Sequence, residues 1–163
     1  MYTCYIGIGS NLGNPVEKAQ QAIEALRKLN VSILLSTSSL YCSKPMGPSD
    51  QPDYINAVVK LKTSLEPLAL LDALQHIELT QGRVRKDERW GPRTLDLDIL
   101  LIDNLEINSD RLTVPHYGMC EREFVLYPLF EIEPTFILPN NKPLSMLVKN
   151  CPRNGLEIFN EIQ

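Results

Sequence analysis

The sequence is poor in the side chains that build redox, zinc and histidine-based catalytic centres. It has four cysteines, two histidines and one tryptophan among its 163 residues. The cysteines are Cys4, Cys42, Cys120 and Cys151. They are scattered and form no C-x-x-C pair, so we expect free thiols in a reducing compartment rather than a disulfide framework or a zinc site.

Long apolar runs and targeting patterns are missing as well. No run approaches the ~20 apolar residues that a membrane-spanning helix needs. Residues 1–7 lack the basic segment and the apolar stretch of a signal peptide. The composition, with 44% hydrophobic and 22% charged residues, is that of a globular protein. We therefore expect a single domain over residues 1–163, in the cytoplasm and without membrane contact.

Two common nucleotide-binding signatures are also absent. The sequence contains no G-x-x-x-x-G-K-[ST] and no protein-kinase signature set. Residues 7–13 contain three glycines, but the spacing G-x-G-x-x-x-G is one residue longer than the dinucleotide-binding fingerprint. We interpret this segment as a tight strand-to-helix turn that needs the backbone freedom of glycine. Any nucleotide must then be held by arginines, metal and loops.

Hydrophobic periodicity predicts an α+β protein. Strands are predicted at 3–9, 31–42, 54–63 and 95–102, with a short strand pair within 105–114. Helices are predicted at 15–29, from Ser64 and Pro67 toward Gly82, at 121–132 and at 143–150. A loop covers 43–53, and the C-terminus is expected to be loose. The order indicates a ferredoxin-like βαββαβ core, with a mostly antiparallel sheet flanked by helices, an added β-hairpin and C-terminal helices.

The most informative segment combines a basic loop with two aspartates. Residues 83–93 carry five positive charges although the net charge of the chain is −4, which favours a small anionic ligand over nucleic acid. On a strand, Asp96 and Asp98 lie on one face, about 7 Å apart along the backbone. Mg²⁺ is commonly held by one or two carboxylates plus substrate phosphates, and arginine suits phosphate oxygens. The sequence therefore predicts a Mg²⁺–polyphosphate site.

The residues after the aspartates strengthen this interpretation. Ile99 to Ile102 are apolar on both faces of the strand, as in a central strand that is buried on both sides. Carboxylates that enter such a strand are costly unless a cation compensates them. For either half taken alone, the alternative stays open that the arginines are solvated surface and that the aspartates cap a strand or form surface ion pairs.

Isolated polar and aromatic residues supply weaker candidates. His116 follows the predicted hairpin and is a candidate hydrogen-bond donor to phosphate, whereas His76 lies inside a predicted helix and suits a structural or surface role. Trp90 lies in a charged loop, which favours a ligand cover. Tyr54 and Phe124, taken singly, are more often core aromatics than stacking partners.

Several segments, in order along the chain, resemble one enzyme family. Residues 89–100, R-W-G-P-R-T-L-D-L-D-I-L, are similar to the signature of the 6-hydroxymethyl-7,8-dihydropterin pyrophosphokinases of the folate pathway. Further similar segments are residues 5–13, 45–48, 51–57, 112–116 and 122–132. The resemblance runs from residue 5 to about 135, and residues 136–163 add almost nothing to it.

The resemblance implies that pyrophosphate passes from ATP, the co-substrate, to the hydroxymethyl oxygen of the dihydropterin, with release of AMP and with two Mg²⁺ ions. The matching catalytic residues are Arg83, Arg93, Asp96 and Asp98, and the two aspartates are the metal ligands. The matching ATP-binding residues are Gln75, Glu78, Arg85, Arg89, Trp90, Arg93, Ile99, Arg111, Thr113, His116, Tyr117 and Arg122. The matching pterin-binding residues are Ser43, Lys44, Pro45, Met46, Tyr54, Asn56, Trp90, Asp96 and Phe124.

Within that family the chain departs at a few positions. Ser43 and Lys44 stand where threonine and proline are familiar, and Cys120 and Glu123 are also unusual. The backbone of Ser43 is expected to contact the pterin, which would make its change harmless. Lys44 bears on the motion of the 44–52 loop. The resemblance implies a monomer with small-molecule partners only.

Two other functions are compatible with parts of the sequence. The same element order occurs in RNA-recognition domains, but the strand 54–63 lacks the glycine and paired aromatics of their RNA-binding motif. A nucleotidyltransferase could use Asp96 and Asp98 as its metal site, and it would release pyrophosphate rather than AMP.

Overall fold

The computed structural model describes residues 1–10, 14–43, 54–82 and 95–159. The strands are β1 (Tyr2–Ser10), β2 (Ser32–Thr37), β3 (Tyr41–Ser43), β4 (Tyr54–Thr63), β5 (Asp96–Ile102), β6 (Ile107–Asn108), β7 (Thr113–Val114) and β8 (Glu157–Ile158). The helices are α1 (Pro15–Arg27), α2 (Pro67–Ile77), α3 (Glu123–Ile132) and α4 (Leu144–Lys149), with a π-helix η1 (Glu78–Gly82) and a 3₁₀-helix η3 (Met119–Glu121). The bounds of β4 and the hairpin β6–β7 confirm the predicted elements.

A six-stranded antiparallel sheet organises most of these elements, and β6 and β7 form a separate two-stranded sheet. The order of the larger sheet is β5–β1–β4–β3–β8, and β2 also pairs with β4. β4 runs along the whole of β1, from the pair Tyr2–Thr63 to the pair Ser10–Ile55. This order and the antiparallel pairing confirm the predicted ferredoxin-like α+β fold.

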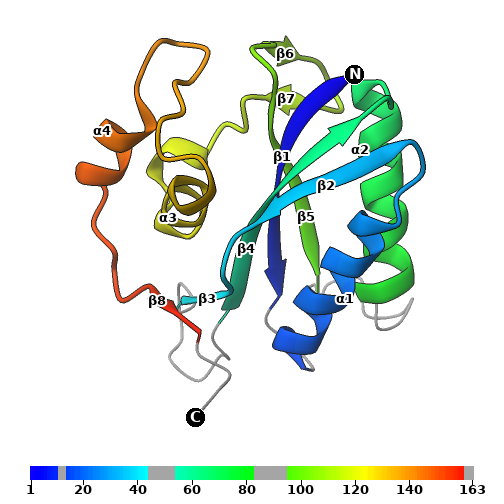
Figure 1. Ribbon diagram of the computed structural model, residues 1–163, viewed down its shortest axis with the longest axis horizontal. Helices are drawn as coiled ribbons and strands as arrows, with labels where there is room; N and C mark the ends of the chain where they lie inside the picture. Colours follow the sequence, from blue (N-terminus) through cyan, green and yellow to red (C-terminus); the bar gives the residue numbers. More distant parts are fainter. Residues whose placement is uncertain (11–13, 44–53, 83–94, 160–163) are drawn as a thin grey trace.

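Alternating side chains give the sheet two different faces. Helices α1 and α2 cover one face, and α3 and α4 lie on the other side (Figure 1). The first core contains Ile6 and Leu61 from the sheet, packed with helix residues such as Leu74. The second core contains Val58 of β4 and Leu126 of α3. Because successive strand residues point to opposite faces, one strand can serve a packed core and a binding face at once.

The predicted strand 31–42 is wrong as one element, because it is interrupted between β2 and β3. The hydroxyl of Ser38 accepts a hydrogen bond from the backbone N–H of Val58 at 2.9 Å, which replaces a regular ladder bond. The backbone and hydroxyl of Ser39 both donate to the carboxylate of Glu131 on α3, at 3.0 and 2.9 Å. Tyr41 donates to the same carboxylate at 2.6 Å. Ser38 and Ser39 thus interrupt the strand after β2, and Tyr41 ties β3 to α3.

Three further expectations need correction. The C-terminal segment is not loose throughout, because β8 pairs with β3 and Phe159 N–H donates to the carbonyl of Leu40 at 2.7 Å. The second predicted helix does not stay α-helical to Gly82, since α2 ends at Ile77 and continues as the π-helix η1. β5 is buried but not central, because it lies at one end of the described strand order.

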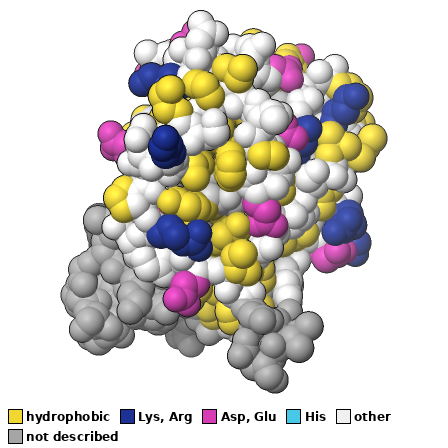
Figure 2. All heavy atoms as spheres, turned by 60° about the vertical axis from the view of Figure 1, so that its left-hand side comes forward, with side chains coloured by type: hydrophobic (Ala, Val, Ile, Leu, Met, Phe, Trp, Pro, Cys, Tyr) yellow, Lys and Arg dark blue, Asp and Glu magenta, His cyan; other side chains and the backbone are white. Residues whose placement is uncertain are grey.

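The outer surface shows no sign of a membrane-crossing helix within the described ranges. None of the helices there is long and apolar enough to cross a membrane. On the face shown in Figure 2, basic and acidic side chains are scattered singly or in small groups among hydrophobic side chains. The described basic residues on that face therefore do not gather into a single stripe.

Candidate functional site

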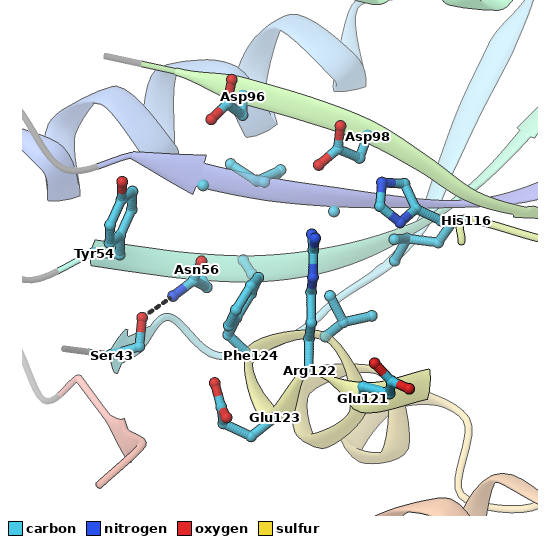
Figure 3. A pocket seen from close by; sticks show the side chains of 16 residues that line it. Ser43, Tyr54, Asn56, Asp96, Asp98, His116, Glu121, Arg122, Glu123 and Phe124 are labelled. Atoms are coloured by element: carbon cyan, nitrogen blue, oxygen red, sulfur yellow. Dashed lines mark hydrogen bonds between the residues drawn. The ribbon is translucent and has the colours of Figure 1, made fainter. Parts of the chain in front are cut away.

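A cavity of about 410 Å³ lies between the sheet and the start of α3. Its size falls in the range of small-molecule sites. Figure 3 shows side chains from β4, β5, the segment after β7 and α3 converging on it. The lining residues are Gly7, Ile8, Gly9, Ser43, Tyr54, Asn56, Ala57, Asp96, Asp98, Leu100, His116, Glu121, Arg122, Glu123, Phe124 and Val125.

The two aspartates of β5 share one face of the strand, as the alternation predicts. Asp96 and Asp98 both line the cavity and lie side by side in Figure 3, while Leu97 and Ile99 are buried in the opposite core. Asp98 is exposed, so the expectation of a buried carboxylate at this position is wrong. The face that carries the carboxylates opens to the cavity and needs no burial of charge.

These carboxylates fit Mg²⁺ as part of a shared site. Within the described ranges, no group of three or more His, Cys, Asp or Glu residues could hold a metal ion alone. Mg²⁺ does not need such a cage, because it commonly keeps several waters and takes one or two carboxylates plus substrate phosphates. Asp96 and Asp98 supply hard oxygen ligands in that number on one cavity wall.

A β-bulge shapes the wall beside the aspartates. The β1–β5 register shifts between Tyr5 and Ile6, so that Leu100 is an extra residue in β5. As a result Leu100 and Leu101 both belong to the core on the α3 side. The carbonyl of Leu100 accepts a hydrogen bond from the backbone N–H of His116 at 2.9 Å. Bulges often redirect side chains next to active sites, and this one holds His116 at the cavity.

His116 is held in one orientation and in one tautomer. Its Nδ1 accepts a hydrogen bond from the backbone N–H of Gly118 at 3.2 Å, so the neutral ring carries its proton on Nε2. Its ring also stacks on Tyr117, with a centroid distance of 4.8 Å. Burial lowers the pKa of His116, Asp98 opposes this shift, and Arg122 adds to it. A neutral His116 can donate one hydrogen bond into the site at neutral pH.

Arg122 brings a positive charge to the cavity from the start of α3. Its guanidinium carbon lies 5.8 Å from the ring centroid of Tyr117 and 5.8 Å from that of Phe124. These distances are within the range of cation–π contacts, which restrain the side chain. In Figure 3 the guanidinium extends from α3 toward the strand that carries Asp98. An arginine placed there is suited to anionic oxygens.

The other end of the cavity is built for a flat polar ligand. Asn56 of β4 donates from Nδ2 to the hydroxyl of Ser43 on β3 at 2.7 Å, and both side chains are buried. Tyr54 and Phe124 line the cavity near this amide (Figure 3). The hydroxyl of Ser43 therefore fixes the direction of the Asn56 amide. The sequence suggested only a contact through the backbone of Ser43.

The glycine-rich segment serves the site in a way that differs from the prediction. Gly7 and Gly9 belong to β1 and line the cavity. Neither has the positive φ that would demand glycine. A Cβ at Gly7 would lie 3.4 Å from Leu100, and a Cβ at Gly9 would lie 3.5 Å from Asn56 Oδ1. Because they have no side chains, these two glycines of β1 leave the floor of the cavity open. Residues 11–13 of the glycine-rich segment lie outside the described ranges.

Several candidates from the sequence lie away from the cavity lining. They are Gln75, Glu78, Ile99, Arg111, Thr113 and Tyr117. Arg111 donates to Asp72 at 2.6 Å and to Gln75 at 3.3 Å, so two of these candidates contact each other at α2. The side chain of Ile99 is buried in the core, and Tyr117 is 81% exposed.

Other predicted site residues fall outside the described ranges. They are Lys44, Pro45, Met46, Arg83, Arg85, Arg89, Trp90 and Arg93. Conversely, the cavity includes Glu121 and Glu123, which were not among the ligand contacts predicted from the sequence. Both flank Arg122, and Glu123 is one of the residues that are unusual in the family, but acidic residues are also common in the first turn of a helix.

The family model described as 7,8-dihydro-6-hydroxymethylpterin-pyrophosphokinase (HPPK) matches residues 5–134, a range that contains every lining residue of the cavity. The chain belongs to this family. It is 57% identical over 149 residues to the 2-amino-4-hydroxy-6-hydroxymethyldihydropteridine pyrophosphokinase of Haemophilus influenzae, covering 91% of this chain and 92% of that protein. The enzyme of the same name from Pseudomonas aeruginosa is 52% identical over 153 residues, covering 94% of each chain.

Solved structures support the fold of this pyrophosphokinase family member independently. A crystal structure of Plasmodium falciparum HPPK-DHPS superposes with a TM-score of 0.69 at 14% sequence identity. The match covers 91% of this chain and 43% of that chain, so this chain spans less than half of the solved protein. At such identity the likeness concerns the fold alone. Family membership, which rests on the sequence matches, makes the chain an enzyme of the diphosphokinase type.

His116 should make the stability of this HPPK family member depend on pH. Because the pKa of His116 is lowered in the folded state, the unfolded chain binds more protons near and below pH 6.5, and stability falls as the pH falls. We expect the free energy of unfolding to decrease from pH 7.5 to pH 5.5 in the wild type and to decrease less in His116→Asn. Denaturant titrations at both pH values measure this difference.

The matched control is His76→Asn, which changes the other histidine at an exposed position on α2. It should lose as much stability over this interval as the wild type. Equal losses in all three proteins would show that His116 carries no such linkage.

Proposed function

We propose that this chain transfers pyrophosphate from ATP to the hydroxymethyl group of 6-hydroxymethyl-7,8-dihydropterin, with Mg²⁺ and with release of AMP, as a step of tetrahydrofolate biosynthesis. The assignment to this reaction class rests on the relatives that are named pyrophosphokinases. One structural observation supports the particular reaction. A single cavity joins a pair of carboxylates on β5 to an aromatic and amide-lined pocket on β4 and α3.

The reaction suits a site that positions two substrates and does little covalent chemistry. The hydroxymethyl oxygen forms a bond to the β-phosphorus of ATP, and the bond from that phosphorus to the α,β-bridging oxygen breaks. AMP leaves with the electron pair, and the hydroxyl proton is released. Such transfers depend mainly on alignment and on stabilisation of phosphate charge.

At the pterin end, Asn56 and the two aromatic rings would recognise the substrate. A pterin is flat and carries hydrogen-bond donors and acceptors on its edge, so it suits rings at Tyr54 and Phe124 with an amide at Asn56. The Ser43 hydroxyl accepts a hydrogen bond from one amide N–H of Asn56 and so fixes the plane of the amide. By the family resemblance, the segment with Lys44, Pro45 and Met46 would complete this end.

At the phosphate end, cations are an electrostatic requirement. The described lining carries four carboxylates, Asp96, Asp98, Glu121 and Glu123, against one guanidinium, that of Arg122. A triphosphate entering such a site would be repelled without added positive charge. We propose that Asp96 and Asp98 hold two Mg²⁺ ions, which when bound would neutralise phosphate charge and align the reacting oxygens.

The remaining positive charge would come from the arginines of the family signature. By the resemblance, Arg83 and Arg93 serve the triphosphate in catalysis, and Arg85, Arg89 and Trp90 contact ATP. Arginine charges near the transferring group stabilise the transition state strongly. A neutral His116 and Arg122, both on the cavity wall, would add hydrogen bonds to phosphate oxygens.

The wider assignments follow the same family. We propose one pyrophosphokinase domain over residues 1–163, acting as a monomer in the cytoplasm on small-molecule substrates. The net charge of −4 and the separated basic side chains on the face in Figure 2 support a small anionic ligand over nucleic acid. The four cysteines are free thiols, in keeping with a reducing compartment.

Product analysis tests the proposed reaction directly. The chain is mixed with ATP, Mg²⁺ and reduced 6-hydroxymethylpterin, and the products are separated by chromatography. We expect AMP and pyrophosphorylated pterin in equal amounts, only when all three components are present. Release of pyrophosphate with a nucleotidylated product would instead indicate a nucleotidyltransferase. Absence of AMP from a folded enzyme with reduced pterin would refute the proposal.

Asp98→Asn should abolish turnover while the fold is kept. The change removes a metal-binding charge from an exposed position, so we expect less than about 1% of wild-type kcat, in line with the loss of a strong electrostatic contact. Rates at saturating Mg²⁺ and thermal unfolding measure the two effects. Glu106→Gln, at an exposed position in the turn before β6, is the control. Near-normal turnover of Asp98→Asn would remove Asp98 from the metal site.

Ser43→Ala should weaken pterin binding selectively. Without the hydroxyl, the Asn56 amide loses its 2.7 Å acceptor and can turn away from the substrate. We expect the KM for the pterin to rise about 10-fold, the cost of roughly one hydrogen bond, with little change in the KM for ATP. Ser43→Thr keeps the hydroxyl and should stay near wild type. Equal changes in both KM values would argue against a role at the pterin end.

A further inference from the structure

The strand that carries the two aspartates has one edge without a partner strand among the described residues. Among the described strands, β5 pairs with β1 alone. Antiparallel partners exchange hydrogen bonds at every second residue, so alternate backbone groups of an end strand point away from the sheet. In the β1–β5 register, Asp96 lies opposite Gly9 and Asp98 lies opposite Gly7. The N–H of Leu97, between them, points outward.

Glu78 supplies the partner for that outward group. The backbone N–H of Leu97 donates to Glu78 Oε2 at 2.7 Å, and the bond is partly buried. This distance is at the short end for an N–H···O bond and is typical of a charged acceptor. The bond joins the first residue of η1 to the middle of the Asp96–Leu97–Asp98 segment.

The local structure holds Glu78 firmly at this edge. It follows α2 directly and begins the π-helix η1, a type of helix that is frequent at functional sites. Thr80 donates from its hydroxyl to the carbonyl of His76 at 3.0 Å. Lys18 of α1 donates from Nζ to the carbonyl of Gln81 at 2.7 Å. Neighbours on both helices thus fix the backbone from which Glu78 reaches β5.

We propose that Glu78 is a positioning residue for the metal-binding aspartates. Its carboxylate fixes the peptide of Leu97 at the edge of the sheet, and this peptide sets the spacing and direction of Asp96 and Asp98, whose side chains project from the sheet face toward the cavity. Glu78 therefore acts through β5, a role that differs from the ATP contact that the family resemblance implies. The effect on catalysis rests on the proposed function, whereas the contact with Leu97 does not.

Two substitutions separate the acceptor from the charge. Glu78→Gln keeps an oxygen at the same reach and removes the charge. Glu78→Asp keeps the charge but is one methylene shorter, so its carboxylate falls short of Leu97. If the contact with Leu97 is what matters, the glutamine variant resembles the wild type and the aspartate variant is impaired. If Glu78 acts through its charge, or by binding cations that accompany ATP, the glutamine variant is impaired and the aspartate variant resembles the wild type.

The first readout is hydrogen exchange of the Leu97 amide, followed by NMR in the absence of substrates. We expect protection to be kept in Glu78→Gln and exchange to be at least 10-fold faster in Glu78→Asp. The second readout is the Mg²⁺ concentration for half-maximal activity. It should rise about 10- to 100-fold in Glu78→Asp, the usual range for loss of a group that orients metal ligands, and change little in Glu78→Gln.

Glu24→Asp is the matched control, because Glu24 pairs with Arg27 on the exposed side of α1, where shortening should alter neither readout. Unfolding curves for all variants confirm that each is folded. Activity loss in Glu78→Gln equal to that in Glu78→Asp would overturn the proposal, as would unchanged Leu97 exchange in Glu78→Asp. If the wild type itself transfers no pyrophosphate, the proposed function fails while the exchange data still decide whether Glu78 holds β5.

Discussion

The antiparallel pairing of β1 with β5 is the interaction on which the site depends. It places Asp96 and Asp98 opposite Gly9 and Gly7, where no side chain competes for the cavity floor. The same pairing turns Leu97 and Ile99 into the core beneath α1 and α2. A shift of one residue would exchange the two sets, burying both carboxylates and exposing apolar groups. The stability of the core and the placement of the carboxylates are therefore one constraint.

Helix α3 converts the remaining sheet face into a bounded cavity. Its Leu126 and Leu129 pack on the sheet, while Arg122 and Phe124 at its start reach the site. The carboxylate of Glu131 holds the other end of α3 to Ser39 and Tyr41. Tyr41 and Ser43 belong to the same short strand, β3. The contact of Tyr41 with α3 therefore also steadies the hydrogen-bonded pair of Ser43 and Asn56. Packing and recognition thus use adjacent turns of one helix.

The features of the fold and the cavity that depend on local periodicity could be predicted from the sequence. The features that depend on tertiary contacts could not. The period of two in residues 96–99 correctly separated the face that lines the cavity from the face in the core, and the strand 54–63 matched its observed bounds. The bulge at Leu100 could not be read from an apolar run, because it depends on register with β1. The break after Thr37 depends on Ser38 bonding to β4, and β8 exists only because β3 offers it an edge. Glycines in β1 looked like a turn signal but provide space.

The charge distribution explains why a carboxylate such as Glu78 is useful outside the cavity rather than within it. The described cavity wall already carries four carboxylates, so in the proposed reaction another carboxylate facing the triphosphate would add repulsion. From the far edge of β5, Glu78 can instead stabilise the backbone through the N–H of Leu97. The contact needs an acceptor oxygen at this reach, and it holds the peptide that lies between two like charges. In the proposed reaction, a rigid backbone between Asp96 and Asp98 would keep both carboxylates placed for a cation, so that metal binding would cost less free energy for ordering the strand.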